Sequence, residues 1–368
     1  MDEGGNRSVK AYVKNPLYWL LLFVPLTLVA ELLHVGEVVI FFFSVLGIVP
    51  LAKLIGDATE ELALHVGPRL GGFLNATLGN AAELIITIVA LRAGLIELVK
   101  ASITGSIVGN LLLIMGLAIL LGGLKHGTQK FDRVNAGLAA TQMTLAIIAL
   151  AIPTFFARAI TANGGTHDTV EALSVGVAIT MLVVYALSVL FTFRREAVEV
   201  PAIETPPVHH HEPTWSKRTA LVVLGLSTVA IAWLSEVLVG AVEPAVAAMG
   251  LSEFFVGIII IPIVGNAAEH LVAVTVARQN KMELSMSIAL GSSMQIALLV
   301  APLLVLLSLF IAPEPMDLVF NPFELEALGA ATIIAAFVAL DGESNWMEGI
   351  QLLAVFVILA IGFFFLPF

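Results

Sequence analysis

Two glutamates stand inside apolar stretches of this chain, within identical local sequences. The letters Gly-Asn-Ala-Ala-Glu occur at 79–83 and again at 265–269, each time inside a long apolar run. A charged side chain at the centre of a bilayer costs roughly 3 kcal/mol on insertion scales, so it is seldom present without a function. Glu83 and Glu269 are therefore the first candidates for a functional site.

The residues around each glutamate can supply neutral oxygen ligands. Glycine followed by asparagine weakens a helix, as at Gly79-Asn80 and Gly265-Asn266, and a break in a helix frees backbone carbonyl groups. The asparagine side chains add amide oxygens. One apolar run later, both halves carry further hydroxyl and amide groups, which are Ser106 and Asn110 in the first half and Ser292, Ser293 and Gln295 in the second.

This set of oxygens suits a calcium ion. Ca²⁺ takes roughly six to eight oxygen ligands, carboxylates among them, whereas softer metals prefer cysteine or histidine. The chain has no cysteine, and His270 is the one histidine within an apolar run near the two motifs. We therefore expect Glu83 and Glu269 to bind Ca²⁺, which would be a substrate and not a resident cofactor.

The same two glutamates can carry protons. A buried carboxyl group is stable when it is protonated or lies beside a cation, because an isolated charge is poorly solvated in an apolar interior. The pair can hold one Ca²⁺ or protons, but hardly both, and this competition is a physical basis for exchange. Two protons for one Ca²⁺ would be electroneutral. No residue is assigned a catalytic role.

Composition places the chain in a lipid bilayer. Its 368 residues are 59% hydrophobic and 12% charged, and the mean hydropathy is +1.02. The formal net charge of -11 excludes a basic protein that binds nucleic acid. No cleavable signal peptide is visible, because the first apolar run is too long and lacks a small-residue cleavage site.

Apolar lengths and polar breaks predict about 11 membrane-spanning helices, and hence an all-α polytopic membrane protein. The predicted spans are residues 17–34, 37–62, 70–93, 98–123, 134–156, 168–193, 217–240, 252–277, 283–311, 323–340 and 346–367.

The two motifs belong to an internal repeat whose matching residues are 186 positions apart. Gly71 also matches Gly257, and Gly105-Ser106 matches Gly291-Ser292. An odd number of predicted spans separates the two copies, so the halves must cross the membrane in opposite directions. This predicts two inverted five-helix repeats, an architecture of secondary transporters with a site at the midplane.

The repeat defines the expected organisation of the chain. A cytoplasmic N-terminus and an extra helix occupy 1–36, and the first repeat occupies 37–193. A cytoplasmic linker at 194–216 carries the histidines 209–211, and the second repeat occupies 217–368.

Basic residues predict the orientation. Lysine and arginine are concentrated in the N-terminal segment and in the even-numbered gaps between spans, while the odd gaps carry only Arg92, Lys100 and Arg158. The N-terminus and linker should therefore be cytoplasmic and the C-terminus external. Lys53, inside the second span, should extend toward the cytoplasmic side, and Arg92 should pair with Glu97. Short loops favour a prokaryotic cell membrane, with an organellar membrane as the alternative.

The paired motifs resemble those of the calcium/proton exchanger (CAX) family of the cation/calcium exchanger superfamily. Further matches are Ala58 to Ala63 (ATEELA), Gly105 to Asn110 (GSIVGN), Gly291 to Ala297 (GSSMQIA) and Asp341 to Trp346 (DGESNW). The resemblance covers the chain from about residue 17. It implies ten core helices in two inverted halves plus one N-terminal helix, with alternating access and Glu83 and Glu269 as shared carriers of Ca²⁺ and H⁺.

Other interpretations stay open at this point. The glutamates could be structural, and Asn80 and Asn266 could serve as interhelical glue. The related sodium/calcium exchangers differ at the motif, so Asn80 and Asn266 favour protons, but a Na⁺/Ca²⁺ or broader divalent-cation exchanger is the alternative. An intramembrane hydrolase or a passive channel is less consistent with a repeat-symmetric pair of acids. A homo-oligomer is left open.

Overall fold

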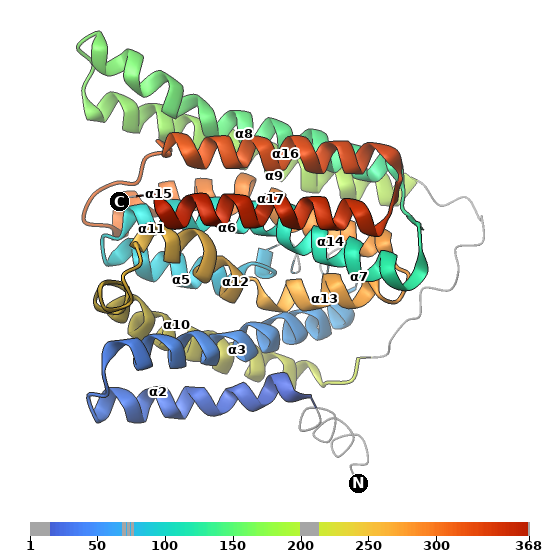
Figure 1. Ribbon diagram of the computed structural model, residues 1–368, viewed down its shortest axis with the longest axis horizontal. Coiled ribbons are helices and arrows are strands. Elements are labelled where there is room, and N and C mark those ends of the chain that lie inside the picture. Colours follow the sequence, from blue (N-terminus) through green and yellow to red (C-terminus); the bar gives the residue numbers. More distant parts are fainter. Residues whose placement is uncertain (1–14, 68–70, 72–73, 75–76, 199–212, 367–368) are drawn as a thin grey trace.

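The structure is a computed structural model, and it describes residues 15–67, 71, 74, 77–198 and 213–366. Nearly all of these residues are helical, and most helices run along one common direction (Figure 1). Their turns gather at two ends of the bundle. The linker end carries residues 127–132, 213–216, 278–281 and 342–345, and the loop end carries residues 33–36, 93–95, 163–166, 250–252 and 312–321.

The first half of the chain forms one 3₁₀ helix, one π-helical segment, seven described α-helices and one short strand. They are η1 (Pro16–Leu22), α2 (Phe23–Leu32), α3 (Glu37–Val66), α5 (Ala81–Arg92), α6 (Ile96–Val108), the π-helical η2 (Gly109–Ile114), α7 (Met115–His126), β1 (Gln129–Lys130), α8 (Arg133–Ala162) and α9 (His167–Val198).

The second half contains two π-helical segments. Its elements are α10 (Lys217–Met249), α11 (Glu253–Phe255), the π-helical η3 (Val256–Ile260), α12 (Ile261–Gly265), α13 (Ala267–Ala277), α14 (Met282–Gln295), the π-helical η4 (Ile296–Val300), α15 (Ala301–Ile311), α16 (Pro322–Asp341), β2 (Glu343–Ser344) and α17 (Trp346–Phe365). The strands β1 and β2 pair antiparallel at the linker end.

The elements that carry the two motifs lie in the middle of the bundle. At one edge α3 packs along α10, and α2 packs against α3 (Figure 1). At the other edge α8 packs against α16. Between these edges lie α5, α6, α12, α13 and α14. The outer helices therefore shield the central ones from lipid, which allows polar groups and irregular backbone in the centre.

The protein is an almost wholly helical, multi-pass membrane protein. Eight helices among the described residues are long and apolar enough to cross a bilayer, or up to nine if the bent pair around Asn266 is one span. The predicted span 17–34 is the shorter stretch Pro16–Leu32. The predicted span 70–93 includes residues outside those described, so the number of about 11 stays a prediction.

Some predicted boundaries are wrong by several residues. Helix α10 continues nine residues past the predicted 240 and ends where Gly250 adopts a left-handed conformation with φ 67°, which glycine tolerates without strain. Helix α9 likewise continues through Val198 into the predicted linker. The histidines at 209–211 lie outside the described residues.

Two glycines bring the halves of the chain into close contact. A Cβ on Gly105 of α6 would lie 1.9 Å from the carbonyl oxygen of Ile258 in η3. A Cβ on Gly257 would lie 2.9 Å from the Cβ of Ala101. The backbones of α6 and η3 therefore approach closely only because both positions lack a side chain. At Gly291, which matches Gly105 in the repeat, nothing lies within 4 Å.

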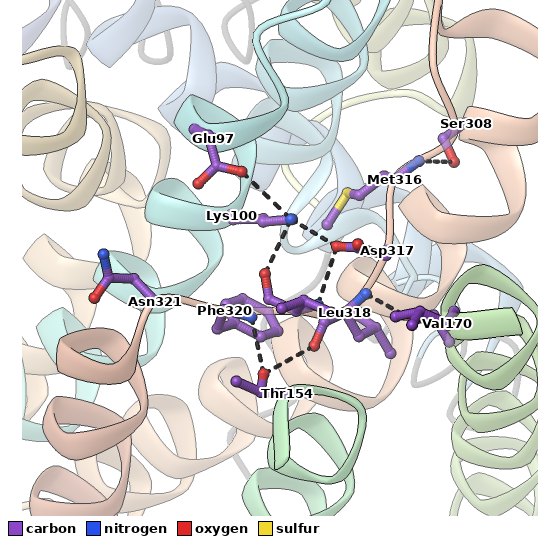
Figure 2. A network of polar contacts seen from close by, with 12 residues as sticks. Glu97, Lys100, Thr154, Val170, Ser308, Met316, Asp317, Leu318, Phe320 and Asn321 are labelled. Carbon is purple, nitrogen blue, oxygen red and sulfur yellow. Dashed lines mark hydrogen bonds and ion pairs between the residues drawn. The ribbon is translucent and has the colours of Figure 1, made fainter. Parts of the chain in front are cut away.

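A buried lysine holds the loop between α15 and α16 at the loop end. Figure 2 shows Lys100 of α6 among its partners, with Asp317 at 2.7 Å, the Val319 carbonyl oxygen at 3.0 Å and Glu97 at 3.4 Å. The side chain of Lys100 is 7% exposed. Arg92 instead lies 4.0 Å from Glu236. The expected pair between Arg92 and Glu97 is therefore wrong, because Lys100 on the next turn of α6 is closer to Glu97.

Backbone contacts complete the attachment of this loop. The amide of Leu318 donates to the Ser174 hydroxyl at 3.0 Å, and the amide of Phe320 donates to the Thr154 hydroxyl at 2.9 Å (Figure 2). Because the loop has few backbone partners of its own, these side chains from α8 and α9 satisfy amides that would otherwise be buried unpaired. The loop between α15 and α16 is thus bound to side chains of three helices, α6, α8 and α9.

The glycine contact predicts unequal effects of one substitution at two matching positions. We expect Gly105→Ala to destabilise the protein by about 2 kcal/mol or more, because its methyl group overlaps a backbone oxygen that cannot rotate away. Gly291→Ala is the control and should change stability little. SDS titration of the purified protein in detergent micelles measures both, and equal stabilities of the two variants would contradict the described packing.

The buried ion pair gives a second prediction. Lys100→Met should lower the free energy of unfolding by about 3–5 kcal/mol, because it leaves Asp317 buried without its cation. The double variant Lys100→Met with Asp317→Leu should regain much of this loss. Arg92→Gln, which removes an exposed pair, should cost no more than about 1 kcal/mol. The same SDS titration compares them, and a Lys100→Met loss as small as that of Arg92→Gln would exclude a structural role for the pair.

Candidate ion-binding site

Both glutamates lie in the first turn of a short helix that follows a break. Asn80 precedes α5 with φ −95° and ψ 22°, and Asn266 precedes α13 with φ −104° and ψ 10°. The identical sequences therefore fold to nearly identical backbones. The break at Asn266 bends the chain by 62° between the helical stretches Glu253–Gly265 and Ala267–Ala277. Each carboxyl group thus sits near the positive N-terminal end of a helix, where negative charge is favoured.

Glu83 is fully enclosed by residues of both halves. Its side chain is 0% exposed, and the Ser106 hydroxyl donates a hydrogen bond to Oε1. Asn266 Nδ2 in turn donates to Ser106 Oγ at 3.0 Å and to the Pro262 carbonyl oxygen at 3.1 Å. A Cβ on Gly265 would lie 3.4 Å from the Cβ of Glu83. The second motif therefore packs directly on the first glutamate.

The matching contact in the other half joins Asn80 to Ser292. Ser292 Oγ donates to Asn80 Oδ1 at 3.1 Å, and Asn80 Nδ2 donates to Gln295 Oε1 at 2.8 Å. Asn110 Nδ2 donates to Ser292 Oγ at 3.0 Å. Each asparagine of a motif thus bonds to the serine of the opposite half. The structure brings all of the predicted hydroxyl and amide candidates together except Ser293, whose hydroxyl donates to the Ala289 carbonyl oxygen of its own helix.

His270 is a member of this network that the sequence identified only by its position. Its Nε2 lies 3.1 Å from Asn110 Oδ1, and the residue is 9% exposed. The adjacency to Glu269 was the one signal in the sequence. The contact fixes the amide of Asn110, which in turn orients Ser292.

Three buried oxygens of the site lack a hydrogen-bond donor among the described residues. They are Glu83 Oε2, Glu269 Oε2 and Asn266 Oδ1. Buried polar atoms are nearly always paired, so such a group of orphan oxygens calls for a proton or a cation. No cluster of three or more His, Cys, Asp or Glu is present in the described part of the chain. A cation here would therefore be bound by two carboxyl groups together with neutral oxygens, as a hard ion prefers.

A cavity reaches Glu269 from the linker half of the bundle. It has a volume of about 630 Å³, and its wall includes Glu269, Ser292 and Gln295 together with Gly79 and Gly265 of the two motifs. Glu83 is not part of this wall. The two glutamates therefore differ in access although their sequences match.

The α3 side of the same cavity contains charged residues that were not among the predicted site residues. Lys53, Asp57 and Glu60 line it. Lys53 was expected to extend toward the cytoplasmic side, and its ammonium group forms an ion pair with Asp57, one turn nearer the linker end. Charged side chains spaced by three and four residues inside an apolar helix were the available signal.

The known proteins that this chain resembles match it over nearly its whole length. The sodium/calcium exchanger protein family matches residues 36–194 and 219–365. A Ca²⁺/H⁺ antiporter of Aphanothece halophytica is 46% identical over 367 residues, which cover 96% of this chain and 98% of that protein. The Ca²⁺/H⁺ antiporter ChaA of Bacillus subtilis is 42% identical and covers 93% of this chain and 97% of its own.

A solved structure shares the fold. The structure of native YfkE superposes with a TM-score of 0.82 at 40% sequence identity, and the match covers 95% of this chain and 100% of that one. The broken helices, the central glutamates and these matches lead to one conclusion: this chain belongs to the sodium/calcium exchanger protein family.

Proposed function

We propose that this protein is a secondary antiporter that exchanges Ca²⁺ for H⁺ at a site built on Glu83 and Glu269. The observation that carries the proposal is the pair of carboxyl groups, Glu83 fully buried and Glu269 half-buried, each with a buried oxygen that lacks a donor, beside a group of hydroxyl and amide side chains. No ion pair joins either glutamate to a lysine or arginine among the described residues. A structural role as one half of an ion pair is therefore not supported, whereas a transport role is favoured by the absence of a fixed cation.

The contacts of Glu83 explain how one group can serve two ions. The Ser106 hydroxyl already donates to Oε1, so Oε2 is the atom that can take a proton or contact Ca²⁺. With Ca²⁺ bound, the two carboxylates compensate its charge. With Ca²⁺ absent, protons make the carboxyl groups neutral and allow them to stay buried. An empty and doubly ionised site is costly, which links the movement of one ion to that of the other.

Neutral ligands complete the proposed site. Asn266 Oδ1 is the orphan amide oxygen, and Ser106 joins the Nδ2 atom of the same asparagine to Glu83. The matching group beside Glu269 and its cavity consists of Asn80, Ser292, Asn110 and Gln295. Gly79 and Gly265 line the cavity beside Glu269, and Gly265 also packs against Glu83. The relatives' printed names, which specify Ca²⁺ and H⁺, support the choice of ions.

Alternating access would follow from the proposed inverted repeat. Gly105 packs tightly against Ile258 on one side of the site, whereas its counterpart Gly291 faces a cavity on the other. If Gly291 became tightly packed and Gly105 came to face a cavity, the linker end would close and the loop end would open. The same ions would then meet the other side of the membrane without any change in their ligands.

The distribution of basic residues supports an orientation with the linker end in the cytoplasm. In this orientation the cavity to Glu269 would face the cytoplasm, with the N-terminus on the same side and the C-terminus outside. We infer two five-helix repeats and an extra N-terminal helix, in a cell membrane.

Neutral substitutions at the two glutamates test the site. Glu83→Gln and Glu269→Gln should each lower proton-driven Ca²⁺ uptake more than about 100-fold, because each variant lacks a group that carries both ions. Uptake is measured in vesicles reconstituted with the purified protein. Glu236→Gln removes an exposed carboxylate near Arg92 and is the matched control with normal uptake. Near-normal transport in both site variants would remove the central claim.

A comparison of driving gradients tests the coupling ion. We expect an imposed pH gradient to drive Ca²⁺ uptake and an imposed Na⁺ gradient to drive little or none, because both glutamates can bind protons and each motif carries asparagine. Uptake driven by Na⁺ alone would identify a Na⁺/Ca²⁺ exchanger and make Ser106 and Ser292 candidate sodium ligands. Flux without dependence on either gradient would point to a channel.

A further inference from the structure

The cavity that leads to Glu269 contains an ion pair that the exchange site does not use. Lys53 and Asp57 lie on α3, inside an apolar helix, and both line the cavity. Their side chains are 22% and 18% exposed. Charged groups so deep in a membrane protein are expensive, and they commonly mark the path of an ion.

Each carboxyl oxygen of Asp57 contacts a donor. Lys53 Nζ contacts Oδ1, and the Tyr18 hydroxyl donates to Oδ2 at 2.6 Å. Tyr18 belongs to η1, the first described element, which packs against α3. Both carboxylate oxygens are therefore occupied, one of them by a cationic group that is part of the protein.

Helix stabilisation alone does not account for this pair. A pair at i and i+4 is more favourable when the acid comes first, and here the lysine precedes the aspartate. The ammonium group extends along the helix toward the linker end, as lysine side chains near helix ends commonly do. It ends at the carboxylate of Asp57, one turn on, and both residues line the cavity.

Further oxygens lie along the same wall. Glu60 is one turn beyond Asp57 and is exposed. Thr59 is 2% exposed, and its hydroxyl has no hydrogen-bond partner in the described part of the chain, although it lines the cavity. An unpartnered hydroxyl at this depth is a ready ligand for a hard cation. Carboxylate and hydroxyl oxygens thus accompany the cavity toward Glu269.

We propose that Asp57 is a cation-binding residue on the path between the linker end and Glu269, and that the Lys53 ammonium group occupies it as a tethered competitor of the transported ion. An arriving divalent cation carries twice the charge of the ammonium group and displaces it from Asp57. Lys53 then swings toward water, and the ion moves on to Glu269. When the path is empty, Lys53 returns and keeps Asp57 neutralised. The inference rests on the proposed transport of Ca²⁺.

Opposite effects of two substitutions test the competition. Lys53→Gln should lower the apparent KM for Ca²⁺ supplied at the linker end about fivefold, since one unit of competing charge is removed. Asp57→Asn should raise the apparent KM about fivefold, because it removes a negative charge that attracts Ca²⁺. The double variant should match Asp57→Asn, because Lys53 acts only through Asp57. Initial uptake rates in reconstituted vesicles give KM and maximal rate separately.

A purely structural pair predicts another pattern. Both single variants would then lower the maximal rate or the stability in the same direction, with no fall in KM for Lys53→Gln, and this result would overturn the proposal. Lys53→Arg keeps the charge and should leave KM near the wild-type value. Tyr18→Phe removes one donor without touching the pair and serves if Asp57→Asn fails to fold.

A second measurement is independent of transport. The chain has no cysteine, so Gly56→Cys introduces a single thiol at a position that lines the cavity and has no heavy atom within 4 Å of its Cβ. The variant is labelled in detergent with a charged thiol reagent, in a background of Glu83→Gln and Glu269→Gln. Ca²⁺ should slow the labelling, and adding Asp57→Asn should abolish this protection.

The two assays separate the possible failures. In one outcome, the wild-type protein shows no proton-driven Ca²⁺ uptake while Ca²⁺ still protects the thiol of the Gly56→Cys variant. This result would leave Asp57 as a binding site and overturn the proposed exchange. Normal uptake without any Ca²⁺ protection, or with protection that survives Asp57→Asn, would overturn the role of Asp57 and leave the exchange intact.

Discussion

The constraint on which this structure depends is the burial of two carboxyl groups without a cationic side chain beside them in the described residues. Charge in an apolar interior must be compensated, and here the partners are hydroxyl and amide groups that cannot neutralise it. In the proposed function, the compensation comes from protons or from an ion that binds reversibly. The broken helices and the serines that reach across from the opposite half surround the carboxyl groups, the outer helices shield them from lipid, and the cavity leaves Glu269 reachable.

Much of this was readable in the sequence because the physical rules involved are local. Glycine and asparagine beside a glutamate predict a break in an apolar helix, and the matched backbone angles at Asn80 and Asn266 fulfil that prediction. The spacing of 186 residues predicted which groups correspond, and Ser106 and Ser292 take matching roles toward the opposite asparagines. Composition and apolar length were sufficient for the membrane class.

The rest depends on packing between distant segments, which no local rule gives. Ser292 and Ser293 are adjacent in the sequence, yet one faces the site and the other bonds to its own helix, because the rotation of α14 decides between them. Lys53 was expected to extend toward the cytoplasmic side, but its partner Asp57, the contact from Tyr18 and the cavity beside α3 were found only in the structure. Helix ends beyond the apolar core, as in α10, were likewise set by a cap at Gly250.

The two identical motifs lie in environments that are not identical. This difference is consistent with a site that is accessible from one side of the membrane at a time. Gly105 touches a backbone oxygen where Gly291 meets open space, and Glu83 is sealed where Glu269 lines a cavity. If both halves packed alike, both sides of the site would be open or both closed, and neither arrangement could move ions against a gradient. In the proposed exchange the two packings would be the alternative states of the protein, and the binding of protons or Ca²⁺ would shift the balance between them.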